Sequence, residues 1–159
     1  MSSAILPTNR MNLRKALFEP GHLDIIELPD DGDKQSILNS KESIASINKF
    51  NGGCITCMID GRILYIAAYY PLHRGVYEVF VLSSIYVSKY PKTFHREIVS
   101  WLEHLRNEEP DVHRFQTHSI ADDKHDRWME RLGFVCEGTL KQYTSEKEDR
   151  RLWAMFIEG

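Results

Sequence analysis

CITCMI (residues 54–59), DGR (60–62) and ILYIAAY (63–69) decide the fold, because two apolar runs flank an Asp-Gly pair. Asp-Gly is a strong signal for a two-residue hairpin turn, since both central positions of that turn favour positive φ. Residues 54–59 and 63–69 are therefore predicted to form a β-hairpin. Cys54 and Cys57 are interpreted as plain strand residues, because side chains three positions apart on a strand point to opposite faces.

A further strand follows this hairpin. After the polar loop PLHRG (71–75), the sequence continues with VYEVFVL (76–82), an almost unbroken apolar run that predicts a strand buried on both faces. Glu78 is the one carboxylate in the run. Ile85 and Val87 either extend the strand or form a bent exit from it.

Helices and a strand alternate after this point. Apolar residues at helical spacing predict a helix over 92–106, and residues 115–120 form a short strand. Another helix begins at Asp122-Asp123 and ends at Leu132, because Gly133 occupies a favoured helix-stop position.

The two ends of the chain complete the set of elements. Residues 134–143 and 152–157 are predicted to form a C-terminal hairpin around a charged segment. At the other end, residues 11–17 form a weak first strand. A helix that Ser40 caps then continues until Gly52-Gly53 stops it.

The order of these elements predicts the fold class. A helix between strands 76–82 and 115–120 implies a right-handed parallel crossover, whereas the hairpins are antiparallel. The expected fold is therefore α+β, with a mixed, mostly antiparallel sheet flanked by helices in a single domain over residues 1–159.

Composition argues against several classes of function. The 159 residues carry 20 Lys and Arg against 23 Asp and Glu, a formal charge of −3, so we expect no bulk binding to nucleic acid or to a membrane surface. No apolar run approaches the ~18–20 residues of a membrane span, and MSSAILPTNR lacks the apolar core of a signal peptide. Three cysteines without a disulfide framework favour a reducing compartment, and hence a cytoplasmic protein. His118, Asp122 and His125 show no zinc-site spacing, so no metal is expected.

The element order and the segment from Asp122 to Phe134, which ends a helix in Leu-Gly-Phe, resemble the GNAT superfamily of N-acetyltransferases. The resemblance covers residues 11–157 and is closest to divergent members encoded by phages. It implies that the strands around 76–82 and 115–120 splay apart to admit acetyl-coenzyme A. It also implies that Glu78 is the general base.

The sequence departs from this family at the coenzyme loop. Family members place glycines there, whose backbone amides bind the pyrophosphate, whereas SKYPKTFHR (88–96) has none and Pro91 removes a donor. The resemblance would then leave the phosphates to the side chains of Lys89, Lys92 and Arg96 at the helix start. The pantetheine would lie along the backbone of three residues, namely Ile85, Val87 and Ser88.

A second departure concerns the general acid. Met129 occupies the place of a tyrosine that often protonates the leaving thiolate, and a thioether cannot donate a proton. Tyr143 or a water could replace it only if the fold brings it near. Asp122 stands where many members have asparagine.

Two functions therefore remain open. The first is an enzyme that moves acetyl from acetyl-coenzyme A to an amine on a small molecule or a protein. The second is a GNAT-like binding or assembly protein of a phage, without coenzyme, that engages a protein partner as a virion component or in the host cytoplasm. Glu78 has a plain alternative as an outward-facing strand residue, and Trp153 leaves a homodimer edge possible.

Overall fold

The computed structural model describes residues 12–29, 34–51 and 53–158, and in these ranges the strands form one sheet of order β1-β2-β3-β4-β5-β7-β6. The strands are β1 (Leu13–Leu17), β2 (Cys54–Ile59), β3 (Arg62–His73), β4 (Val76–Ser83), β5 (Arg114–Ile120), β6 (Val135–Leu140) and β7 (Arg150–Phe156). The helices are α1 (His22–Ile25), α2 (Lys34–Asn51), the 3-10 turn η1 (Ile85–Ser88), α3 (Pro91–Glu108) and α4 (Asp123–Leu132). Strands β4 and β5 are parallel, and the other neighbouring pairs are antiparallel. The predicted α+β class is confirmed.

Local signals placed several elements correctly. Asp60 and Gly61 have φ values of 49° and 80°, as the turn between β2 and β3 requires. Asp122 caps α4 by accepting a hydrogen bond from the His125 amide at 2.8 Å. Gly133 ends that helix in the left-handed region, with φ of 103°.

Other expectations were wrong. The PLHRG segment is mostly strand, because β3 continues to His73 and pairs with β4 across a bulge after Pro71. Proline is tolerated there because the pairing between β2 and β3 ends at Ala68, so no strand within the described residues pairs with the far side of β3 at Pro71. Helix α2 begins at Lys34, so Ser40 lies within the helix rather than at its cap. The stop at Gly52 lies outside the described residues.

Of the two expectations for the exit from β4, the structure shows the bent exit and not a longer strand. Residues Ile85 to Ser88 form η1 rather than more strand, because the Ser84 hydroxyl accepts from the Tyr86 amide at 3.2 Å and turns the chain. The Ile85 amide donates to the carbonyl of Glu27 at 2.8 Å, which fixes the turn against the segment after α1.

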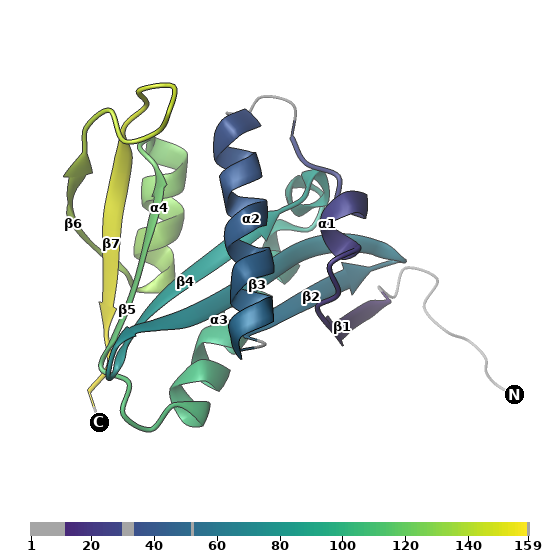
Figure 1. Cartoon of the computed structure of the whole chain (residues 1–159), viewed down its shortest axis with the longest axis horizontal. Coiled ribbons are helices and arrows are strands. Elements are labelled where there is room, and N and C mark those ends of the chain that lie inside the picture. The colour runs from purple at the N-terminus through teal and green to yellow at the C-terminus, as the bar shows by residue number, and fades with distance from the viewer. Residues whose placement is uncertain (1–11, 30–33, 52, 159) are drawn as a thin grey trace, which may run out of the picture.

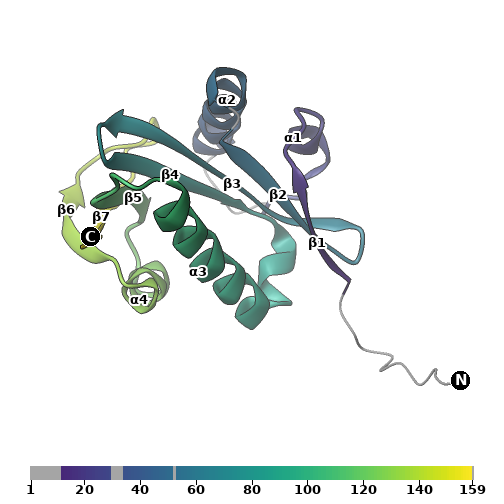
Figure 2. The ribbon, with the colours of Figure 1, turned by 90° about the horizontal axis from the view of Figure 1, so that it is seen from below.

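Helices cover both faces of the sheet. Helices α1 and α2 lie on one face, and α3 and α4 lie on the other (Figure 2). Cys57 belongs to the core under α3 and α4, whereas Cys54 belongs to the core under α1 and α2. In β4 only Val79 and Leu82 are buried, so the expectation of burial on both faces was wrong.

The sheet splits between β4 and β5. Their pairing is limited to Val76 with Arg114, Tyr77 with Phe115 and Glu78 with Gln116, and both strands then continue apart. Figure 1 shows the two halves of the sheet as the arms of a V that meet near the C-terminus. The splayed arrangement is confirmed, and it explains the half-exposed β4, since beyond Glu78 one edge of the strand has no neighbour in the described residues. No helix in the described ranges combines the length and the apolarity that crossing a membrane would require.

Candidate functional site

Glu78 lies at the apex of the V, as the last residue of β4 that pairs with β5. Its side chain is half-buried, and Oε2 is inaccessible and has no hydrogen-bond partner among the described residues. Burial raises the pKa of the Glu78 carboxyl, although a hydrogen bond from Gln116 and the charge of Arg114 oppose the rise. A carboxylate in such a place is a stronger base than one in water.

A chain of polar contacts holds Glu78 from the β5 side. The Gln116 side chain hydrogen-bonds Glu78, and Arg114 Nε donates to Gln116 Oε1 at 3.0 Å. Arg114 is anchored in turn by Glu137 of β6, with Nη1 and Oε2 2.9 Å apart. The chain joins β4, β5 and β6 across the closed end of the V.

His118 continues this row along β5. Residues two apart on a strand share a face, so His118 lies on the same face as Gln116, one step further into the opening V. Its Nδ1 is buried and has no partner in the described part of the chain. Burial, and then the charge of Arg150, lower the pKa of His118, so the imidazole is neutral at pH 7.

Tyrosines complete the surroundings. The ring of Tyr143, from the segment between β6 and β7, meets the His118 ring edge-on with centroids 5.2 Å apart. Tyr70 of β3 is the direct cross-strand neighbour of Glu78. Burial, Glu78 and Tyr143 together raise the pKa of Tyr70. We name Tyr70, Glu78, Gln116, His118 and Tyr143 the apex cluster.

The candidate phosphate-binding cations lie together, but on the other side of the sheet. Lys89 follows η1, and Lys92 and Arg96 are one turn apart on α3. All three side chains are exposed, and none forms an ion pair within the described residues; the Lys89 ammonium lies 5.5 Å from the Tyr90 ring centroid. The structure therefore groups these cations with one another and not with Glu78.

Beneath the V, α3 and α4 meet through aromatic rings. Phe94 stacks on Trp128 with centroids 5.2 Å apart, and Trp128 Nε1 donates to His95 Nδ1 at 3.2 Å. Met129, in the place of the expected general acid, is buried and only 4% exposed. Among the residues considered for that role, Tyr143 is the one with an acidic hydroxyl, and it lies in the apex cluster.

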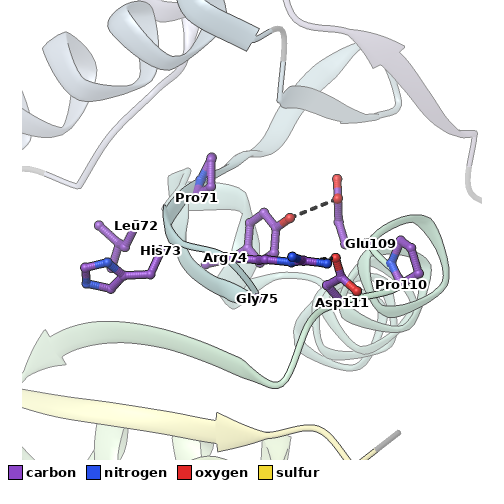
Figure 3. Close-up of a pocket in the computed structure, with 9 residues that line it drawn as sticks. Pro71, Leu72, His73, Arg74, Gly75, Glu109, Pro110 and Asp111 are labelled. Carbon is purple, nitrogen blue, oxygen red and sulfur yellow. Dashed lines mark hydrogen bonds and ion pairs between the residues drawn. The ribbon is translucent and has the colours of Figure 1, made fainter.

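His73 and Arg74, weighed above as a polar loop, line a cavity of about 340 Å³ at the closed end of the V (Figure 3). Arg74 Nε is 3.1 Å from Asp111 Oδ2, and the Tyr77 hydroxyl donates to Glu109 Oε2 at 2.9 Å. These polar side chains are engaged with one another in holding the turn against the loop after α3.

Cys54 and Cys57 are buried, and His118 and His125, which the sequence analysis weighed as metal ligands, contact different residues. Burial raises the pKa of both Cys54 and Cys57 to about 11, so both are protonated and unreactive at neutral pH. His125 pairs with Asp122 at 2.7 Å, whereas His118 contacts Tyr143 instead. In the described ranges no three His, Cys, Asp or Glu side chains are placed to hold a metal ion.

No protein-family model matches this chain, and no curated protein matches it in sequence. Solved structures do match. A chimera of the spermidine N-acetyltransferase from Vibrio cholerae and hSSAT is 14% identical, with a TM-score of 0.68 over 91% of this chain and 95% of that one. The GNAT-family acetyltransferase from Bacillus anthracis is 15% identical, with a TM-score of 0.62 over 91% and 94%. The ribosomal-protein-S5-alanine acetyltransferase from Vibrio fischeri is 16% identical, with a TM-score of 0.59 over 91% and 92%.

The chain has the GNAT fold. At these identities the likeness concerns architecture alone, and it gives no support to the phage character that the sequence suggested. Within a GNAT fold, the fit of acetyl-coenzyme A can be tested on the segment that precedes α3.

That segment offers few backbone donors. The amides of Ile85, Tyr86 and Val87 donate to Glu27, to the Ser84 hydroxyl and to the Ser84 carbonyl. The Ser88 hydroxyl donates to the Ile85 carbonyl at 3.0 Å, and α3 opens with Pro91, which has no N–H. A backbone cradle for pyrophosphate is therefore not built here. The side chains of Lys89, Lys92 and Arg96 do fit phosphate, as exposed cations at a helix start.

Sequence reasoning proposed Glu78 as the general base but did not name Arg114 or Gln116, which interact with it, or place His118 beside it. Arg114, Gln116 and His118 alternate along β5, which is the period-two signal of a polar strand face. That signal was available, but only the V reveals why polar residues face inward there. Tyr143 was named only as a conditional candidate, and the tertiary structure places it beside His118.

Proposed function

We propose that this chain is an N-acetyltransferase that transfers acetyl from acetyl-coenzyme A to an amine. One observation carries the proposal: at the apex of the split between β4 and β5, the Glu78 carboxylate has one inaccessible oxygen, Oε2, with no hydrogen-bond partner among the described residues. Its raised pKa matches what a proton acceptor for an amine requires. The GNAT fold of the three acetyltransferase neighbours supports the same assignment.

Coenzyme binding and proton transfer would take place on opposite faces of the sheet. Lys89, Lys92 and Arg96 would hold the phosphates on the α3 side, and η1, including Ile85, Val87 and Ser88, would border the pantetheine. Acetyl-coenzyme A supplies a thioester carbonyl that an amine nitrogen can attack, and the carbon–sulfur bond breaks to release coenzyme A as the thiolate. Glu78, on the α2 side, accepts the proton that the nitrogen loses as its bond to carbon forms.

A second candidate is a GNAT-fold binding protein without coenzyme, such as a phage virion component or a factor that engages a host protein. The specific observation in its favour is the commitment of the Ile85, Tyr86 and Val87 amides to acceptors within the protein. Met129 in the usual place of the acid favours it as well.

Titration with acetyl-coenzyme A separates the two. Binding stabilises the native state by RT ln(1 + [L]/Kd), about 2.7 kcal/mol at a hundredfold excess over Kd. The enzyme requires saturable heat in calorimetry and a raised melting temperature. If millimolar acetyl-coenzyme A produces neither effect, the enzyme proposal is refuted and the binding-protein proposal remains.

Substitutions then test the proposed role of each residue. Glu78→Gln should lower turnover by about 10²- to 10⁴-fold without weakening acetyl-coenzyme A binding. Replacing Lys92 and Arg96 together with alanine should weaken that binding, and more so at low salt. Arg106→Ala is the matched control, since this exposed cation lies on the same helix about 21 Å from Lys92. Equal coenzyme affinity in the double variant would place the phosphates elsewhere.

A further inference from the structure

Arg114 of β5 is bonded to its neighbours through all three nitrogens of its guanidinium group. Nε donates to Gln116 Oε1 at 3.0 Å, while Nη1 and Nη2 donate to Oε2 and Oε1 of Glu137 at 2.9 and 2.5 Å. The guanidinium carbon lies 5.6 Å from the ring centroid of Phe156. A guanidinium that is bonded along two edges and packed on a ring has little freedom to rotate. Arg114 is therefore a rigid link between β5 and β6.

A bulge in β6 supplies the carboxylate of this link. In the pairing of β6 with β7, Cys136 is opposite Trp153 and Gly138 is opposite Leu152, so Glu137 is the extra residue without a partner in the ladder. Bulges change the direction of a side chain and are over-represented next to active sites. The two side chains of the ion pair are only 20% and 33% exposed, which makes their attraction stronger than that of a pair in open water.

Arg114 determines which end of the Gln116 amide faces Glu78. A glutamine amide has a carbonyl end that accepts hydrogen bonds and an NH2 end that donates them. Arg114 Nε occupies the carbonyl end, so the NH2 end remains for Glu78, which is opposite Gln116 in the ladder. An ionised carboxylate can only accept. Burial raises the pKa of Glu78, and the hydrogen bond from Gln116 opposes that rise because it favours the ionised form.

The charge of Arg114 acts on Glu78 as well. It too opposes the rise in the pKa of Glu78. Tyr70 is the neighbour of Glu78 on β3, and His118 lies on the same face of β5 as Gln116. Burial raises the pKa of Tyr70 and lowers that of His118, so both side chains are neutral at pH 7. Of these neighbours, Arg114 is the one that brings a charge.

We propose that Arg114 is a positioning residue for the Glu78 carboxylate. Through Gln116 it holds a hydrogen-bond donor against the carboxylate, and Glu137 determines how much of its positive charge acts there. This inference rests on the proposed role of Glu78 as proton acceptor, and it adds residues on β5 and β6 that tune that role. Arg114 influences the reaction through Glu78 and is not itself a catalytic residue.

The pH dependence of kcat/KM tests this inference, because it reports the ionisation of groups in the free enzyme. Activity requires ionised Glu78, so removal of the guanidinium in Arg114→Met should move the acidic limb to higher pH by about half a unit or more. Glu137→Gln breaks the same ion pair but leaves the charge of Arg114 uncompensated, so the limb should move to lower pH. A link that only supports the fold would move neither limb, or both in the same direction. Either of these outcomes would overturn the inference.

A further variant covers the case in which Arg114→Met does not fold. Gln116→Met removes the amide donor and keeps a side chain of similar length, so it should move the acidic limb in the same direction as Arg114→Met. An unchanged limb in a folded Gln116→Met protein would contradict the proposed route from Arg114 to Glu78.

Arg151→Met is the matched control. Arg151 of β7 pairs with Asp126 of α4 at 3.3 Å and donates to the Thr139 hydroxyl of β6 at 2.8 Å, so this substitution also breaks a partly buried ion pair. Arg151 is opposite Ser119 in the ladder and lies on the face that α4 covers. Its loss should leave the acidic limb in place. A shift as large as that of Arg114→Met would show that loss of any such pair moves the limb, and would overturn the inference.

Urea unfolding provides a readout that needs no substrate, so the inference can be tested even if acetyl transfer is refuted. Each protein is compared, between pH 4 and 8, with the same protein carrying Glu78→Gln. The free energy of unfolding of the Gln form should exceed that of the Glu form increasingly as pH rises, because the native state raises the pKa of Glu78. At pH 8 this difference should be larger with Arg114→Met than in the native background, and smaller with Glu137→Gln. Equal differences in the three backgrounds, or changes of the same sign, would overturn the inference whatever the enzyme does.

Discussion

Replacing Gly75 with alanine tests what holds the V closed at its base. Gly75 forms the turn between β3 and β4 with φ of 81°, and its carbonyl accepts from the amides of His113 and Arg114 at 2.9 and 3.2 Å. A Cβ at Gly75 would lie 2.4 Å from His113 Nδ1 and 2.5 Å from the carbonyl oxygen of Asp111. The turn therefore fits directly against the loop that leads into β5 (Figure 3).

Gly61 provides a matched control for this substitution. It has φ of 80°, almost the same as Gly75, but a Cβ there would have nothing within 4 Å. Alanine at Gly61 should cost about 1–2 kcal/mol, the penalty of the left-handed conformation alone. Alanine at Gly75 adds overpacking, typically about 1–3 kcal/mol, so its total cost should be about 2–5 kcal/mol.

Urea unfolding of the two variants measures the difference. We expect the free energy of unfolding to be lower for Gly75→Ala than for Gly61→Ala by at least about 1 kcal/mol, with similar denaturant dependence. The loss would be larger because the Asp111 contact is with backbone, which cannot move without displacing the start of β5. Equal stabilities would show that the loop yields freely and that close packing does not pin the base of the V.

Three further outcomes follow from burial and capping. Because burial raises the pKa of Glu78 in the native state, ionisation of this carboxyl destabilises the native protein as pH rises above 4.5, the ordinary pKa of glutamate. The free energy of unfolding of Glu78→Gln should therefore increase relative to that of the native protein as pH rises. A difference between the two free energies of unfolding that stays constant from pH 4 to 8 in urea titrations would contradict this. Cys136 is exposed and should react with a thiol reagent in the native state, whereas Cys54 and Cys57 should react only on unfolding; three equally fast thiols would refute it. Asp122→Ala removes the cap of α4 and should cost about 0.5–2 kcal/mol, measured as a lower melting temperature.

Local sequence signals predicted much of the fold. The Asp60-Gly61 turn and the cap pair of Asp122 and Gly133 depend on conformations that a few adjacent residues decide, and the structure shows them as expected. The element order then implied the parallel pairing of β4 with β5, since a helical crossover returns the chain in the same direction.

Expectations failed where a distant segment overrode the local pattern. Pro71 suggested a loop, but β4 pairs with the end of β3 and keeps it extended. The apolar run around Glu78 suggested burial on both faces, yet the split removes the neighbour that would bury it. Neither outcome could be predicted from nearby residues, because both depend on which strands remain paired.

For the site, the sequence by itself determined the chemical groups: a carboxylate in an apolar strand, a polar row along the following strand and cations at a helix start. Only the tertiary structure decided that Glu78 and His118 lie on the same face of the sheet beside the split, while Lys92 and Arg96 lie on the helix that covers the other face. The reason is that these positions depend on how far β4 and β5 stay paired. That extent is decided by packing among residues far apart in the chain, including the contact of Gly75 with His113.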